Sequence, residues 1–67
     1  MMRITLNGES KEVPEQLTIG GLIRHVKLIP ELMVAEVNER IYKRDQYESV
    51  VIQSGDVVEL LRFVGGG

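Results

Sequence analysis

The 67-residue sequence lacks several residue types that small proteins use for stabilisation or catalysis. It has no cysteine and no tryptophan, a single phenylalanine, two tyrosines and one histidine. Without cysteine there is no disulfide bond and no zinc-finger cluster, which fits a reducing compartment. One histidine leaves too few ligands for a typical zinc site. The chain must therefore fold as one domain around a small apolar core, and its 43% hydrophobic content makes this possible.

The sequence also lacks an excess of basic charge and a long hydrophobic run. Eight Lys and Arg against ten Asp and Glu give a formal net charge of −2, and only Arg40, Lys43 and Arg44 lie close together. Nucleic-acid binding requires a basic face, so we expect no nucleic-acid partner. No apolar run approaches the roughly 20 residues of a membrane span, and the first residues do not resemble a signal peptide. We therefore expect a cytoplasmic protein that does not enter a membrane.

No pattern in the chain is typical of a catalytic or nucleotide-binding site. It has neither a Walker A motif nor a dinucleotide fingerprint, and its carboxylates form no obvious convergent pair for acid–base chemistry. We interpret His25 as a surface residue, and Tyr42 and Tyr47 as packing residues. The expectation is a protein without catalytic residues, a bound cofactor or a metal site of its own.

The first part of the chain predicts a β-hairpin. Apolar and polar residues alternate over residues 2–7, which indicates a half-buried strand. Asn7-Gly8 is typical of a type I′ turn, because both central positions of that turn take positive φ. A return strand is expected at about residues 10–13, and Pro14 ends it because proline cannot donate to a ladder.

A short helix is predicted to follow the hairpin. Thr18 has the side-chain oxygen of a helix N-cap. One apolar face then contains Ile19, Leu22, Ile23 and Val26. Gly20 and Gly21 in the first turn cost about 1 kcal/mol each relative to alanine. Packing rather than intrinsic propensity must therefore stabilise this helix.

Three further strands are predicted, at residues 33–37, 41–43 and 57–63. Residues 44–49 are polar and irregular, 50–52 are apolar and ambiguous, and 53–56 form a turn. In the last strand Glu59 should face water, so Val58 and Leu60 should enter the core. Leu61 and Phe63 then lie on the solvent face, where exposed apolar residues indicate a docking surface. The alternative is a bulge that returns Phe63 to the edge of the core.

These elements predict an α+β fold, a β-grasp (ubiquitin-like) domain with a mixed sheet of four to five strands and one helix across it. The first strand, the helix and a later parallel strand would form a right-handed crossover, which makes the first and last strands central. We expect residues 1–64 to form this domain and residues 65–67 a flexible glycine tail.

The glycine tail is the most distinctive stretch, because Gly65, Gly66 and Gly67 follow directly from an apolar strand. Glycine has no Cβ, so such a tail can pass through a narrow space. Fully extended, Val64 to Gly67 reach about 13 Å, at ~3.3 Å per residue. That reach is enough to place the Gly67 carboxylate in another protein's active site. The alternative is a frayed terminus without a function.

The chain resembles the ThiS family, the small sulfur carriers of thiamine biosynthesis. The resemblance runs from Ile4-Thr5-Leu6-Asn7-Gly8 at the start to Phe63-Val64-Gly65-Gly66-Gly67 at the end. Between them it includes Leu17-Thr18-Ile19, Val37-Asn38, Ile41, Arg44, Tyr47 and Gly55-Asp56-Val57-Val58-Glu59-Leu60-Leu61. Gly20-Gly21 depart from the better helix formers that relatives often have at this position.

The resemblance implies a mechanism that uses the Gly67 carboxylate as the covalent site. A ThiF-like adenylyltransferase would use ATP and Mg²⁺ to form an acyl-adenylate, and a persulfide sulfur donor would displace AMP to leave a thiocarboxylate. Thiazole synthase (ThiG-like) would accept the sulfur. Gly65 and Gly66 would allow passage of the tail, and Leu61, Phe63 and Val64 would dock on partners.

Three alternatives remain at this point. The chain could be the small subunit of molybdopterin synthase (MoaD-like), which also carries a thiocarboxylate on a Gly-Gly end. It could be a ubiquitin-like modifier that is joined through Gly67 to a lysine. It could also be a β-grasp binding module whose terminal glycines have no function.

Overall fold

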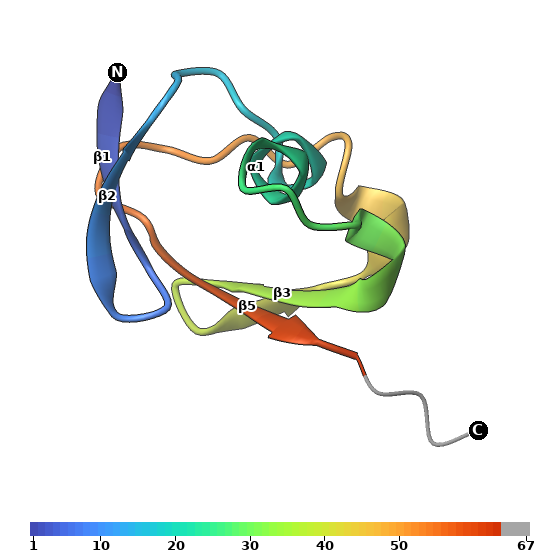
Figure 1. The fold of residues 1–67 in the computed structure, drawn as a ribbon. Coiled ribbons are helices and arrows are strands. Elements are labelled where there is room, and N and C mark those ends of the chain that lie inside the picture. The colour runs from blue at the N-terminus through green and yellow to red at the C-terminus, as the bar shows by residue number, and fades with distance from the viewer. Residues whose placement is uncertain (64–67) are drawn as a thin grey trace.

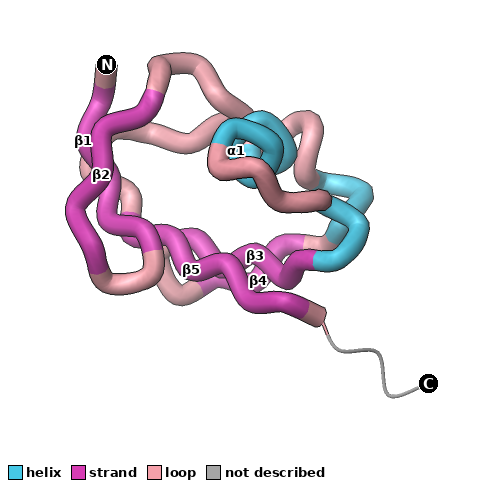
Figure 2. The backbone as a smooth tube through the Cα atoms, viewed as in Figure 1, coloured by secondary structure: helices cyan, strands magenta, loops and turns pink. Residues whose placement is uncertain are grey.

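The computed structural model describes residues 1–63 as a five-stranded sheet with one helix across it (Figure 1). The elements are, in order, β1 (Met2–Leu6), β2 (Glu9–Val13), α1 (Ile19–His25), the 3₁₀ turn η1 (Pro30–Leu32), β3 (Met33–Val37), β4 (Arg40–Tyr42), the 3₁₀ turn η2 (Arg44–Gln46) and β5 (Val57–Arg62). Both 3₁₀ turns lie at the same end of the sheet (Figure 2). No helix within residues 1–63 is long and apolar enough to cross a membrane.

The sheet has the strand order β2-β1-β5-β3-β4. Only β1 and β5 are parallel, with Thr5 opposite Val57 and Leu6 opposite Val58. The other neighbouring strands are antiparallel. The predicted β-grasp fold is thus confirmed, and the last strand lies at the centre of the sheet beside the first.

The β1–β2 hairpin and the start of α1 have the predicted local structure. Asn7 and Gly8 have φ values of 49° and 84°, as a type I′ turn requires. The Thr18 hydroxyl accepts a hydrogen bond from the Gly21 amide at 3.0 Å, which confirms the N-cap. The amides of Ile19 and Gly20 donate to the carbonyl groups of Val50 and Tyr47 at 2.9 and 2.8 Å. The segment that follows η2 therefore anchors the first turn of the helix.

The core lies between α1 and the inner face of the sheet. It consists of Met2, Ile4, Val13, Ile19, Leu22, Ile23, Met33, Ala35, Val37, Tyr47, Ile52, Val58 and Leu60. The predicted parity of the strands is confirmed, since Val58 and Leu60 are buried whereas Leu61 and Phe63 are 55% and 53% exposed. His25 is exposed, also as predicted.

Tyr47 does more than fill space in this core. Its hydroxyl group donates to the Met33 carbonyl at 2.9 Å and accepts from the Ala35 amide at 3.0 Å. Both backbone groups belong to β3, at the point where the short strand β4 ends. The buried phenol therefore supplies hydrogen bonds to β3 beyond the point where its neighbouring strand β4 ends.

Element boundaries differ from the predictions by a residue or two. The strand predicted at residues 41–43 is Arg40–Tyr42, because Arg40 follows a two-residue turn at once and pairs with Val37. The ambiguous residues 50–52 form no strand of their own. Val51 makes an isolated bridge to Thr18, and Ile52 is buried. The last strand ends at Arg62, one residue earlier than predicted.

Candidate functional site: the outer face of the sheet and the C-terminal strand

The candidate site is built around β5, because this strand leads out of the domain. It runs between β1 and β3 and ends at the margin of the molecule, away from the hairpin (Figure 1). On the side of β3 it is paired along its length, from Val58 opposite Val37 to Arg62 opposite Met33. The Phe63 amide adds a further bond to the Leu32 carbonyl at 2.7 Å. The sheet thus holds β5 in place up to Phe63.

The opposite side of β5 is bonded differently, because β1 ends at Leu6. Asn7 donates its backbone N–H to the Val58 carbonyl at 2.9 Å. Its side chain then pairs with both backbone groups of Leu60. Asn7 Oδ1 accepts from the Leu60 amide at 2.8 Å, and Nδ2 donates to the Leu60 carbonyl at 3.3 Å. One asparagine side chain therefore replaces the missing residue of β1.

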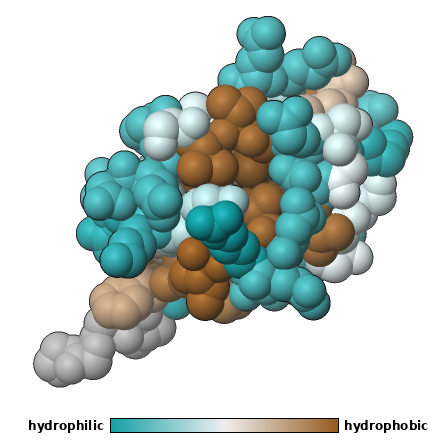
Figure 3. Space-filling view, turned by 180° about the vertical axis from the view of Figure 1, so that it is seen from behind, coloured by the Kyte–Doolittle hydropathy of each residue, from teal (hydrophilic) through white to brown (hydrophobic). Residues whose placement is uncertain are grey.

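The face of the sheet turned away from α1, here called the outer face, carries both apolar and acidic residues. Val57, Leu61 and Phe63 are 48%, 55% and 53% exposed, and Ile41 on β4 is 67% exposed. Val34 lies directly opposite Leu61, and Glu36 lies directly opposite Glu59. Figure 3 views the molecule from behind, with the outer face seen from the side, and shows apolar and hydrophilic side chains lying next to one another. Such a mixed surface can bind a protein without driving aggregation.

The clearest electrostatic feature of the described residues is an ion pair that involves the helix. The best-formed ion pair joins Arg24 on α1 to Glu48, with hydrogen bonds of 3.0 and 2.9 Å. The hydrogen bond from Arg24 lowers the pKa of the exposed Glu48 carboxyl group. A Cβ on Gly20 would contact the Glu48 carboxylate. Glycine at this helix position thus leaves room for the ion pair, which explains a residue that intrinsic propensity disfavours.

Among the described residues, two of the hollows lie beside the β1–β2 hairpin. One is lined by Met1, Met2, Arg3, Glu12, Glu15, Gln16 and residues 51–54. The other is lined by Leu6, Asn7, Glu9, Ser10, Lys11, Val26, Leu28 and Leu60. Residues 1–63 contain no group of three His, Cys, Asp or Glu side chains that could hold a metal ion.

The predicted site residues divide into two groups. Leu61 and Phe63 lie where the sequence placed them, exposed on the outer face. Val64, Gly65, Gly66 and Gly67 lie outside the described residues, and with them the boundary predicted between domain and tail.

The prediction missed the neighbours of Leu61 and Phe63 on the outer face, namely Val34, Ile41 and Glu36. Alternation within each strand shows which residues share a face. The sequence does not show which strands are adjacent or how they are aligned. Only the register that places Val34 beside Leu61 assembles this surface.

Residues 4–67 match the model of the ThiS family. The chain belongs to the ThiS family. It is 32% identical to the sulfur carrier protein ThiS of Bacillus subtilis, in a match that covers 96% of this chain and 98% of that protein. The crystal structure of a thiamine biosynthesis protein (ThiS) from Geobacter metallireducens superposes with a TM-score of 0.85. That protein is 32% identical, with 98% of this chain and all of that one covered.

A different kind of relative is the thiazole synthase of Magnetococcus marinus. It is 36% identical over 66 residues, which is 98% of this chain but only 20% of that enzyme. The thiazole synthase of Paramagnetospirillum magneticum matches over the same share of its length at 27% identity. The chain thus spans about a fifth of these two enzymes, each of which contains a ThiS-like segment.

Proposed function

We propose that this chain is a sulfur carrier of thiamine biosynthesis and acts as a protein cosubstrate rather than as an enzyme. The observation that carries the proposal is the match to the ThiS family through residue 67, together with the match over nearly the whole Bacillus sulfur carrier. The family match favours this role over the small subunit of molybdopterin synthase. An exposed apolar face beside the last strand supports a role that depends on partner proteins.

The reacting group in this proposal is the carboxylate of Gly67. It is ionised at neutral pH and a poor electrophile in that form. A cytoplasmic ThiF-like enzyme with bound Mg²⁺ lets a carboxylate oxygen attack the α-phosphorus of ATP, which releases pyrophosphate and forms the acyl-adenylate. The terminal sulfur of a persulfide then displaces AMP. The product is an acyl disulfide on Gly67. A thiol then attacks the outer sulfur of this disulfide, forms a new disulfide with it, and releases the Gly67 thiocarboxylate.

Thiazole synthase is the proposed acceptor of this sulfur. The support comes from the two thiazole synthases in which a segment similar to this chain forms part of the same polypeptide. Such an arrangement holds the carrier close to its acceptor at a high effective concentration. Docking is assigned to Leu61, Phe63 and Val64, and Gly65 and Gly66 allow the tail to enter the active site of either partner.

Intact-protein mass spectrometry tests this proposal. The purified chain is incubated with ATP, Mg²⁺, a ThiF-like enzyme and a persulfide donor, and each component is omitted in turn. We expect a mass gain equal to the exchange of one oxygen for sulfur, localised to Gly67 and dependent on every component. An unchanged mass, with an enzyme that loads the Bacillus carrier in parallel, would overturn the proposal. An adduct with lysine side chains of other proteins would identify a modifier instead.

A further inference from the structure

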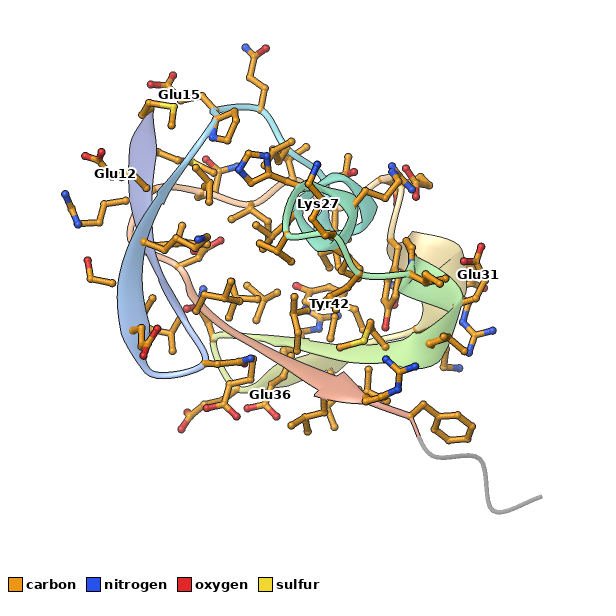
Figure 4. All side chains as sticks on the ribbon, viewed as in Figure 1. Glu12, Glu15, Lys27, Glu31, Glu36 and Tyr42 are labelled. Atoms are coloured by element: carbon orange, nitrogen blue, oxygen red, sulfur yellow. The ribbon has the colours of Figure 1, made fainter. Side chains whose placement is uncertain are left out.

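Two glutamates face each other across the centre of the outer face. Glu36 on β3 lies directly opposite Glu59 on β5. On either side of this pair along the same ladder, Asn38–Val57 and Leu32–Phe63 are joined by backbone hydrogen bonds. Because bonded pairs alternate along an antiparallel ladder, Glu36 and Glu59 also form a bonded pair, with Cα atoms about 5.5 Å apart. Figure 4 shows Glu36 pointing away from the side of the sheet that α1 covers.

These two residues, here called the acidic pair, are not neutralised within the described part of the chain. The ion pairs among residues 1–63 are Met1–Glu15, Arg3–Glu12 and Arg24–Glu48. Arg40, on the adjacent strand, has its guanidinium 5.2 Å from the centre of the Tyr42 ring. Like charges directly opposite each other on a sheet are destabilising. The domain therefore keeps an unfavourable arrangement at the centre of its sheet.

Apolar side chains flank the acidic pair on the same face. Glu36 is itself half-buried, and its partner on β4 is the exposed Ile41. The next pair along the ladder that shares this face is Val34–Leu61. A partner that covers these apolar groups would also remove water from the carboxylates. Burial of uncompensated charge is strongly unfavourable, so the covering surface must supply a cation.

We infer that the outer face is a docking surface for a protein that places an arginine side chain between Glu36 and Glu59 and packs apolar side chains around it. A guanidinium group offers five donors in a planar fork and can bridge two carboxylates, which an ammonium group does less well. The inference rests on the proposed function, and the occupant it names is the enzyme that adenylates Gly67.

The test compares two variants with the same change in net charge. Glu36→Gln/Glu59→Gln removes the charge of the acidic pair and keeps the shape of both side chains. The control, Glu9→Gln/Glu31→Gln, removes two exposed carboxylates from β2 and η1. Binding to the ThiF-like enzyme is measured at low and high salt, with thermal unfolding of each variant alone. Because both variants lose two negative charges, any weakening of the overall electrostatic attraction to the enzyme is the same in both.

We expect the acidic-pair variant to bind about tenfold or more weakly than the control, because the partner's cation is left without its counter-charge. Its affinity should also depend less on salt, and its unfolding temperature should equal or exceed that of the wild type. The combination of undiminished stability and impaired binding is not expected of residues with a merely structural role.

Equal binding of the two double variants, with the wild type loaded normally, would overturn the inference and leave the proposed function intact. Normal binding to the adenylating enzyme with loss of binding to thiazole synthase would show that the named occupant is wrong. Failure of the wild-type chain to bind or be loaded would count against the proposed function itself.

Discussion

Asn7 has two separate structural roles, and the sequence reveals only one of them. Asn-Gly is a local signal, and the positive φ of Asn7 confirms the turn that it predicts. The second role is the pairing of its amide with the backbone of Leu60, 53 residues away along the chain. No local pattern reports a contact at that separation. Turn preference therefore explains only part of why asparagine occupies position 7.

Replacement of Asn7 by glycine separates these two roles. Glycine adopts the left-handed conformation without strain, so the turn is kept while both side-chain hydrogen bonds to Leu60 are lost. We expect Asn7→Gly to lower the free energy of unfolding by about 1–3 kcal/mol. Urea denaturation measures this loss, and hydrogen exchange of the Leu60 amide should be faster.

The matched control is Glu39→Gly. Glu39 also has a positive φ, 69°, in a two-residue turn, but no hydrogen bond of its side chain is found among the described residues. Because glycine relieves the strain at this position, the control should be neutral or stabilising. Equal losses in both variants would mean that the Asn7 amide contributes nothing beyond the turn.

At the scale of elements, strand β5 was predicted with its two faces assigned correctly. A single charged residue, Glu59, fixed the parity, since a glutamate is almost never buried unpaired. The short strand β4 was displaced by one residue in the prediction, because a three-residue strand has too little periodicity to define its start. The hydrogen bonds of Tyr47 to β3 could not be predicted, since they depend on where β4 ends.

The neighbouring residues Leu60 and Leu61 should respond to truncation in opposite ways. Leu60 is 4% exposed, so Leu60→Ala should lower the free energy of unfolding by about 2–5 kcal/mol. Leu61 is 55% exposed, and Leu61→Ala should stay within about 0.5 kcal/mol of the wild type. Chemical denaturation provides both values.

The effects on binding should have the reverse order, with Leu61→Ala weakening binding more than Leu60→Ala. The Leu60 variant is assayed at a temperature at which it remains folded. Leu61→Ala and Phe63→Ala should both weaken binding to the ThiF-like enzyme, because they remove apolar contact area from the outer face. A core-sized loss of stability for Phe63→Ala would contradict the assignment of this residue to the outer face. Unchanged affinity for both variants would remove Leu61 and Phe63 from the docking surface.

At the scale of the whole molecule, the core residues and the proposed reactive group belong to different stretches of the chain. Every residue of the core lies between Met2 and Leu60, whereas the proposed covalent site is Gly67. The boundary between domain and tail stays a prediction from the sequence, which rests on the end of the apolar periodicity where the glycines begin. It follows that the stability of the domain and the chemistry of the tail should respond to different changes in the chain.

Deletion of Gly67 tests this separation directly. The core and the ladder of β5 up to Phe63 are left intact, so the unfolding temperature should match that of the wild type. The new terminal carboxylate, on Gly66, falls short of the adenylating site by about 3.3 Å, one extended residue. Since misplacement by about 1 Å can cost a hundredfold in rate, sulfur loading measured by intact mass should be lost. A truncated chain that folds normally and is loaded at the wild-type rate would remove Gly67 as the covalent site, whereas a lower unfolding temperature would show that the tail contributes to the fold.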